Sequence, residues 1–164
     1  MEVKWSEVAS QECSIARTLS VVGDSWTMLV IRELFNGNGR FNGLLDAVKA
    51  PPAILSERLA SLERDDVIVK RPYSSRGDRF EYRLTPKGRD LYPVLISLMA
   101  WGDRWMTNGA APVQLVHRSC GHHVTPTLTC PHCGDHVDPR DMQRHDNAAP
   151  ASRPARGSCS SEHL

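Results

Sequence analysis

The sequence has almost no excess charge, few aromatic side chains and no long hydrophobic run. Its 164 residues carry 20 Lys and Arg against 19 Asp and Glu, a net charge of +1, and 6% of them are aromatic. Binding to nucleic acid would therefore need local clusters of Lys and Arg. No apolar stretch approaches the about 20 residues of a membrane span, and the opening MEVKWSEVAS lacks the pattern of a secretory signal. We expect a cytoplasmic protein without membrane contact.

Cysteine is scarce and unevenly placed. Of the five cysteines, three lie between Cys120 and Cys133. An odd number grouped in this way does not fit a disulfide framework. It favours reduced thiols that bind metal or react, in a reducing compartment.

The length suffices for one compact domain and an accessory segment. We expect the domain over residues 10–108, a linker over 109–116 that follows a Gly, Ala and Pro-rich stretch, and a Cys and His-rich extension over 117–145. The tail 146–164 is rich in Ala, Ser, Pro and Arg and is expected to be disordered, because it lacks the apolar content to fold. No internal repeat is found in the sequence.

Hydrophobic periodicity predicts four helices in the first part of the chain, over residues 15–22, 25–35, 41–48 and about 52–64. In the second, Trp26, Leu29, Val30 and Leu34 form a broad apolar stripe. In the fourth, Leu55, Leu59 and Leu62 stand at i, i+4 and i+7 and predict a core-facing edge. The residues left facing outward are small or polar: Ala53, Ser56, Glu57 and Ala60.

After Asp66 the hydrophobic period changes from that of a helix to that of a strand. Residues 67–71 and 79–84 read as strands, the second with clean alternation, and residues 72–78 form the hairpin loop between them. A long helix follows, with Thr85 as its N-cap, Pro86 at its first position and a kink expected at Pro93. Its apolar residues are Leu91, Val94, Leu95, Leu98, Trp101 and Trp105.

This order of elements is typical of a winged helix-turn-helix. The fold class we predict is mainly α with a small β-hairpin (α+β). Residues 52–64 would be the recognition helix, because a helix fits the major groove of B-DNA and its early residues reach base edges. Ala53, Ser56 and Glu57 occupy those early positions.

Positive charge is concentrated around the predicted hairpin, where only Asp78 and Glu81 oppose it between residues 70 and 89. The basic residues there are Lys70, Arg71, Arg76, Arg79, Arg83, Lys87 and Arg89. Phosphate neutralisation with counterion release would give sequence-independent affinity for DNA. Arg76, beside Gly77 at the tip, suits a minor groove or the backbone. The alternative is a solvated surface hairpin without a partner.

Four phrases in order resemble the HxlR-type regulators, a branch of the MarR-like winged-helix repressors. They are GDSWTMLVIREL (residues 23–34), RFNGL (40–44), LSERL (55–59) and EYRLTPKG (81–88). The resemblance implies a homodimer built from the N-terminal helix and the long C-terminal helix. It also implies paired recognition helices and wings on a pseudo-palindromic operator. One departure is Pro51-Pro52, where the family often has a longer, glycine-initiated turn.

The resemblance also marks three further positions. Arg40 and Arg58 match basic positions common in the family and are candidates for phosphate or structural contacts; Arg58 is equally a candidate for an internal ion pair. Cys13 matches an N-terminal cysteine that senses oxidants or electrophiles in some of these regulators, and Arg17 one turn later could stabilise its thiolate. We favour the commoner role of a free cysteine, packing as a small buried residue.

Residues 117–121, HRSCG, and 130–134, CPHCG, each place two soft ligands before a glycine. Two ligands at this spacing turn around one ion, and the glycine lets amides approach the sulfurs. We predict a zinc-ribbon-like hairpin whose zinc is structural, because four protein ligands leave no position for water. The preferred ligands are His117, Cys120, Cys130 and Cys133, with His122, His123, His132 and His136 as substitutes for His117. Loss of the metal, or a redox Cys130–Cys133 pair, is the alternative.

We therefore expect a homodimeric DNA-binding repressor, not an enzyme, that competes with polymerase for a promoter and is released by a small molecule or a thiol modification. One alternative is a metal or thiol enzyme using the Cys130–Cys133 segment, which would need a pocket and an acid–base pair. Another is a winged helix that docks a protein partner, with the hairpin charge incidental.

Overall fold

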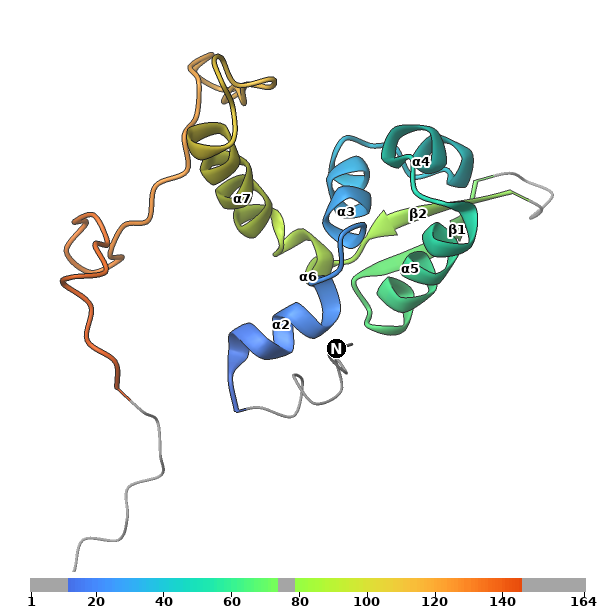
Figure 1. Cartoon of the computed structure of the whole chain (residues 1–164), viewed down its shortest axis with the longest axis horizontal. Helices are drawn as coiled ribbons and strands as arrows, with labels where there is room; N and C mark the ends of the chain where they lie inside the picture. Colours follow the sequence, from blue (N-terminus) through green and yellow to red (C-terminus); the bar gives the residue numbers. More distant parts are fainter. Residues whose placement is uncertain (1–11, 74–78, 146–164) are drawn as a thin grey trace, which may run out of the picture. The chain divides into compact units, whose positions relative to one another are not determined.

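The computed structural model describes residues 12–73 and 79–145 of the chain and divides into two units, Met1–Pro126 and Thr127–Leu164. Figure 1 shows helices and one small hairpin in the first unit. Its elements are α2 (Ser14–Val22), α3 (Thr27–Phe35), α4 (Phe41–Val48), α5 (Pro52–Arg64), β1 (Ile68–Pro72), β2 (Phe80–Leu84), α6 (Pro86–Arg89) and α7 (Tyr92–Trp105). The fold is mainly helical with a two-stranded antiparallel sheet, as predicted. The predicted tail, 146–164, lies outside the described residues.

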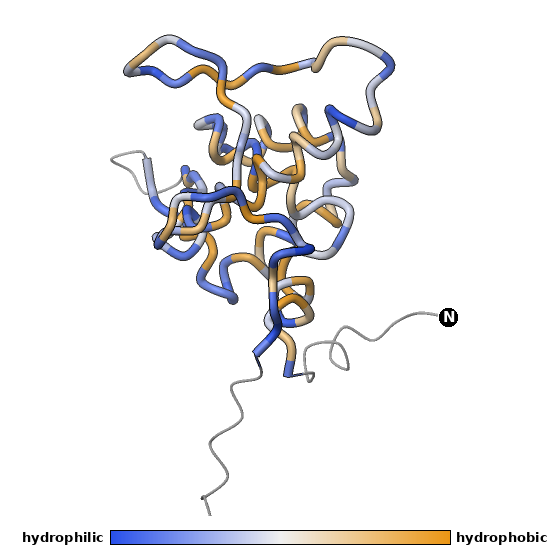
Figure 2. Tube along the Cα trace, turned by 90° about the vertical axis from the view of Figure 1, so that its left-hand side faces the viewer, coloured by the Kyte–Doolittle hydropathy of each residue, from blue (hydrophilic) through white to orange (hydrophobic). Residues whose placement is uncertain are grey.

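The helices bury one face each. Along the first unit, hydrophobic and hydrophilic residues alternate in short stretches (Figure 2), as expected for helices that cover a core. The predicted edge of α5 is confirmed, because Leu55, Leu59 and Leu62 are all buried. The buried core consists of Val22, Val30, Ile31, Leu34, Leu44, Val48, Ala50, Leu55, Leu59, Leu62, Val67 and Ile68.

Local hydrogen bonds set where α3 begins. The helix starts at Thr27 and not at the predicted residue 25. Asp24 Oδ1 accepts hydrogen bonds from the N–H groups of Trp26 at 2.8 Å and Thr27 at 3.2 Å. The side chain of Asp24 thus satisfies N–H groups that have no partner inside the helix. α4 and α5 begin and end at the predicted residues.

The turn between α4 and α5 uses an unusual residue. Lys49 adopts the left-handed conformation, with φ of 59°, and its N–H bonds the Leu45 carbonyl at 3.0 Å. Glycine or asparagine commonly fills such a position. Lys49 therefore makes a turn that glycine commonly makes at the end of a helix, and Pro51 and Pro52 lead directly into α5.

The two strands pair in a register that assigns each side chain to a face. Ile68 lies opposite Leu84, and Lys70 lies opposite Tyr82. On the other face Arg71 lies opposite Glu81. Since successive side chains of a strand point to opposite faces, Lys70 and Arg71 leave the hairpin on different sides.

The helix predicted to run unbroken from Pro86 is divided in two, at Asp90 and Leu91. Pro93 lacks an N–H, and in a continuous helix its ring would collide with the carbonyl four residues earlier, that of Arg89. The N–H of Leu91 bonds the Gly88 carbonyl at 3.2 Å instead, which closes a tighter turn. The prediction of one helix with a kink at Pro93 is therefore wrong: the interruption lies just before the proline. None of the described helices is both long and apolar enough to cross a bilayer.

Thr85 and Gly88 join α6 to the start of β1. Thr85 is the predicted N-cap: its Oγ1 accepts from the Gly88 N–H at 3.1 Å and donates to the Asp66 carbonyl at 2.6 Å. Gly88 lies so close to the backbone of Val67 that a β-carbon would overlap the Val67 carbonyl oxygen. Glycine is required here for space, and the close approach fixes the base of the hairpin.

We predict that Gly88→Ala lowers the free energy of unfolding by about 1–3 kcal/mol, as overpacking of a well-packed site does. Urea denaturation followed by circular dichroism measures this loss. Gly102→Ala is the matched control, because a β-carbon at Gly102 meets nothing within 4 Å. Within α7 that change should raise the free energy of unfolding by about 0.5–1 kcal/mol. Equal stability of the two variants would contradict the account.

Candidate nucleic-acid interface

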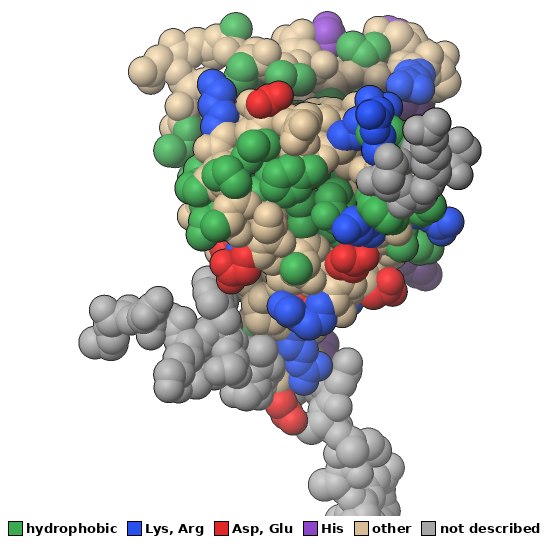
Figure 3. Space-filling view, turned by 90° about the vertical axis from the view of Figure 1, so that its right-hand side faces the viewer, with side chains coloured by type: hydrophobic (Ala, Val, Ile, Leu, Met, Phe, Trp, Pro, Cys, Tyr) green, Lys and Arg blue, Asp and Glu red, His purple; other side chains and the backbone are tan. Residues whose placement is uncertain are grey.

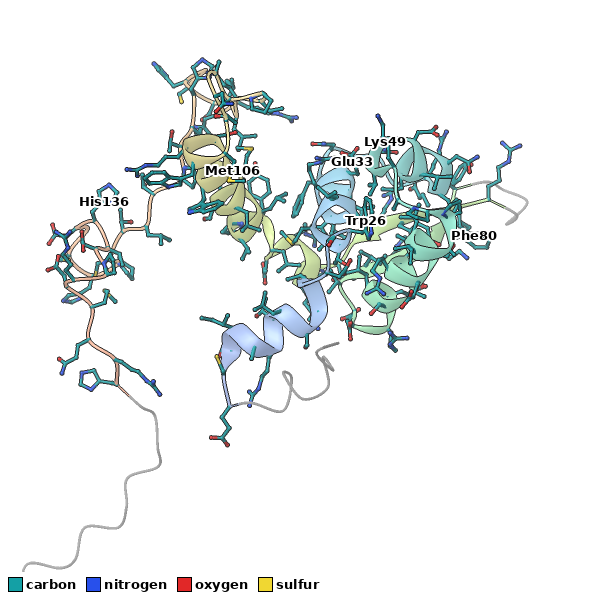
Figure 4. The ribbon with its side chains drawn as sticks, in the orientation of Figure 1. Trp26, Glu33, Lys49, Phe80, Met106 and His136 are labelled. Atoms are coloured by element: carbon teal, nitrogen blue, oxygen red, sulfur yellow. The ribbon has the colours of Figure 1, made fainter. Side chains whose placement is uncertain are left out.

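The outer face of α5 is small, polar and exposed. Ala53, Ser56 and Glu57, the predicted base-reading residues, are all exposed, as is Ala60. No branched or aromatic side chain stands among these four, so the helix surface can approach another molecule closely. The turn at Lys49, labelled in Figure 4, leads into the N-terminal end of this helix.

The Arg58 side chain is mostly buried and is held by two carboxylates. Its Nη2 lies 2.6 Å from Glu57 Oε1, and its Nη1 lies 3.6 Å from Asp24 Oδ2. The side chain is 26% exposed, and its Nε is buried without a hydrogen-bond partner among the described residues. Of the two roles left open by the sequence, the structure shows the internal ion pair.

The predicted wing contacts Lys70, Arg71 and Arg79 are exposed. Lys70 Nζ lies 4.7 Å above the ring of Phe80, which keeps the ammonium beside the hairpin. No carboxylate of the described residues forms a salt bridge with any of these three cations. Figure 3 shows Lys and Arg side chains grouped on the face of the molecule that carries the hairpin. The predicted contact at Arg76 lies outside the described residues.

The other cations of this region have partners inside the protein. Arg83 Nη2 lies 2.5 Å from Glu81 Oε1. Lys87 Nζ donates to the Asp65 carbonyl at 2.6 Å, and Arg89 Nη1 donates to the Leu84 carbonyl at 3.0 Å. Lys87 and Arg89 therefore stabilise the base of the hairpin, Arg83 is paired within its own strand, and the sequence alone could not separate these three from the unpaired cations.

Arg40 lies beside the hairpin although it is distant in sequence. It precedes the first turn of α4, and its guanidinium carbon is 4.6 Å from the centre of the Tyr73 ring. The loop before it is fixed by a 2.7 Å hydrogen bond from the Tyr82 N–H to the Gly39 carbonyl. Burial, and then the nearby Glu63 carboxylate, raises the pKa of Tyr82 above its ordinary value. Sequence reasoning found Arg40 but missed its stacking partner, since no local pattern links them.

Two helices carry exposed apolar faces. On α7, Trp101 is 60% exposed and Trp105 is 62% exposed. Val94 and Leu98 are also exposed and lie on the same side of the helix at i, i+4, i+7 and i+11 with the two tryptophans. The described residues of α2 add a smaller patch, Ile15 and Leu19. Exposed apolar groups of this kind mark sites of association.

Cys13 stands at the N-terminal end of α2 and is exposed. The favoured expectation of a buried packing residue is therefore wrong for this position. The backbone N–H of Arg17 bonds the Cys13 carbonyl at 3.0 Å, as in the first turn of a helix. An exposed thiol at a helix N-terminus is accessible to reagents.

The two segments that the sequence pairs, HRSCG and CPHCG, belong to a longer structural repeat in the extension. Antiparallel bridges join Val116 to His123 and Thr129 to His136, so corresponding residues are thirteen positions apart (116 to 129, 123 to 136). The turn glycines, Gly121 and Gly134, both have positive φ, 72° and 80°. The hydrogen bonds also correspond: in each copy the glycine N–H bonds the carbonyl of the first ligand residue at 2.8 Å. The comparison of HRSCG with CPHCG indicated the two turns, but not the bridges that flank them.

Within each turn the candidate metal ligands interact with their neighbours. In the first, His117 Nδ1 lies 3.3 Å from Cys120 Sγ. In the second, hydrogen bonds from the N–H groups of Cys133 and His132 lower the pKa of the Cys130 thiol. No three His, Cys, Asp or Glu side chains of the described residues are gathered as a metal site. The predicted zinc site takes two ligands from each unit, and it stays a prediction.

The helix-turn-helix formed by α4 and α5, followed by the basic hairpin, defines a winged-helix regulator of transcription. The comparison with known families agrees with this class. The chain belongs to the HxlR-like helix-turn-helix family, which it matches over residues 21–110. The family suggested by the four sequence phrases is confirmed.

Related proteins carry corresponding names. Rv3095 of Mycobacterium tuberculosis, named an uncharacterized HTH-type transcriptional regulator, is 41% identical over 130 residues, 79% of this chain and 82% of that protein. The crystal structure of PA1607, a candidate transcription factor, matches with a TM-score of 0.77 and 32% identity, over 85% of this chain and 98% of PA1607. The oxidized form of the redox regulator HypR matches with a TM-score of 0.53 and 28% identity, over 56% of this chain and 96% of HypR.

Proposed function

We propose that the protein is a repressor that binds a pseudo-palindromic DNA operator as a homodimer. The outer face of α5 would enter the major groove, while Lys70, Arg71 and Arg79 neutralise phosphates beside it. The observation that carries this proposal is the division of the basic residues. Three hairpin cations are exposed without a carboxylate partner among the described residues, next to a helix whose outer face is small and polar.

Two kinds of contact would contribute to binding. Phosphate contacts from the hairpin would fix the position of the protein on the duplex, and the early residues of α5 would read base edges. A two-fold dimer would present two such helices to half-sites spaced by about one turn of DNA. Occupation of that site within a promoter would exclude polymerase.

We predict that affinity for duplex DNA falls steeply with rising salt, because binding releases counterions from the phosphates. Fluorescence anisotropy with a labelled genomic fragment, titrated at several salt concentrations, gives the slope. Arg71→Ala and Arg79→Ala should each flatten that slope by about one unit. Arg32→Ala is the control, since this exposed arginine of α3 pairs with Glu33 at 2.9 Å. Absence of binding below micromolar to both genomic and non-specific duplex would overturn the proposed function.

The homodimer is supported by the exposed apolar stripe of α7 and the smaller patch on α2. Four large apolar side chains on one side of a helix would cost solubility unless another surface covers them. A second copy of the chain offers the same stripe, which can pack against itself across a two-fold axis. The proposal therefore assigns α2 and α7 to the dimer contact and leaves α5 and the hairpin to DNA.

We predict that Trp101→Glu converts a dimer into a monomer at micromolar concentration, because it places a charge inside the apolar contact. Analytical ultracentrifugation measures the change. The variant should still fold, because Trp101 is exposed in the single chain. Leu128→Glu is the control, because Leu128 is exposed in the other unit and is expected to leave the mass unchanged. A wild-type protein that sediments as a monomer would refute the dimer.

Release of the operator is proposed to follow binding of a small molecule or modification of a thiol. Cys13 is the candidate thiol, because it is exposed and stands at a helix N-terminus, where a thiolate is stabilised. It also begins α2, one of the two helices assigned to the dimer contact. The structural neighbour HypR is itself a redox regulator.

We also propose a structural zinc ion bound by His117, Cys120, Cys130 and Cys133. The residues fit such an ion, because thiolate and imidazole are the ligands that zinc prefers. The repeated turn, the left-handed glycine in each copy and the lowered pKa of Cys130 support the proposal. Zinc would supply folding energy to a segment with little buried core, with no water left for hydrolysis.

We predict about one zinc ion per chain, since four ligands complete one tetrahedral site. Elemental analysis of protein purified without chelators measures it. Cys130→Ser should lose the zinc, whereas Cys13→Ser, at an exposed cysteine of the first unit, should retain it. Zinc-free wild-type protein would contradict the prediction.

A further inference from the structure

Glu57 places a negative charge where the proposed function puts DNA. It belongs to the early, outward-facing part of α5, and its side chain is 62% exposed. A carboxylate near phosphates weakens binding by like-charge repulsion. Such a residue is compatible with a DNA-reading surface only if its oxygens accept a specific hydrogen bond or its charge is offset.

The charge of Glu57 is partly offset by Arg58, which Glu57 shares with Asp24. The guanidinium bridges Glu57 Oε1 at 2.6 Å and Asp24 Oδ2 at 3.6 Å. Asp24 is itself fixed by the N–H groups of Trp26 and Thr27 at the start of α3. Glu57 is therefore tied through Arg58 to the body of the protein, which restricts its rotamers. No hydrogen bond from the described residues reaches Glu57 Oε2.

A carboxylate can only accept hydrogen bonds, and the major groove offers two base donors, the amino groups of cytosine and adenine. Beside its amino group adenine presents the N7 acceptor, which repels a second carboxylate oxygen. Cytosine presents no acceptor there. The chemistry of Glu57 therefore favours cytosine.

We propose that Glu57 determines base specificity by accepting a hydrogen bond from the amino group of a cytosine in each half-site, and that Arg58 is a positioning residue for it rather than a phosphate contact. This inference rests on the proposed function and names the base that α5 reads. Arg58 also reduces the repulsion between Glu57 and the neighbouring phosphates.

The test uses the full-length protein. A wild-type site is first selected from randomised duplexes, and every base pair of it is then changed singly. Affinities are compared for wild type and Glu57→Gln. We expect one cytosine per half-site whose replacement weakens wild-type binding about tenfold or more. Glu57→Gln should lose that preference and favour adenine at the same position, because the amide pairs with both N6 and N7. Glu63→Gln, at another exposed glutamate of α5, should change no position.

Arg58→Met and Arg58→Lys test the positioning role. Both should weaken the cytosine preference at that one position and leave the salt slope of binding unchanged. A slope flatter by about one unit would identify Arg58 as a phosphate contact and overturn this part. The milder Arg58→Lys variant keeps the test valid if Arg58→Met fails to fold.

The outcomes separate the two proposals. If wild type shows no salt-dependent binding to any duplex, the proposed function fails. If wild type selects a site and Glu57→Gln keeps the wild-type preference at every position, only the reading by Glu57 fails.

Discussion

The burial of three leucines on one side of α5 fixes the surface that the rest of the molecule presents. Leu55, Leu59 and Leu62 are buried against α3, α4 and β1, and each contributes about 1.5–3 kcal/mol on leaving water. Because all three leucines must face the core, the helix can take only one rotation about its axis. Ser56 and Glu57 must then face outward, so the same packing that stabilises the domain also orients the residues that would meet DNA.

The charges around this helix serve two purposes that composition cannot distinguish. Lys87 and Arg89 bind backbone carbonyls at the base of the hairpin. Lys70 and Arg71, although adjacent in sequence, leave opposite faces of β1. The position of α6 brings Lys87 and Arg89 to these carbonyls, and the alternation of side chains along β1 separates Lys70 from Arg71. The number of Lys and Arg residues in this segment therefore overstates the positive charge that is available to a partner.

The extension consists of two copies of one short turn. His117 corresponds to Cys130, and the two residues inside each turn also differ, whereas the Cys and Gly that close each turn are the same in both copies. Three backbone hydrogen bonds correspond in the two copies. Two short turns with few buried side chains need another source of stability, and a bound metal ion is one that small segments commonly use.

The sequence alone determined the helices, the hairpin, the α5 edge and the family, because periodicity, caps and turn residues act over a few neighbouring positions. It placed Thr85 as an N-cap but not the interruption at Asp90, which arises from a collision between Pro93 and the carbonyl of Arg89. It left Arg58 with two possible roles. Only the tertiary structure showed the internal ion pair, since the carboxylate of Asp24 that completes it comes from a segment far away in the chain, and no local pattern encodes such a distance.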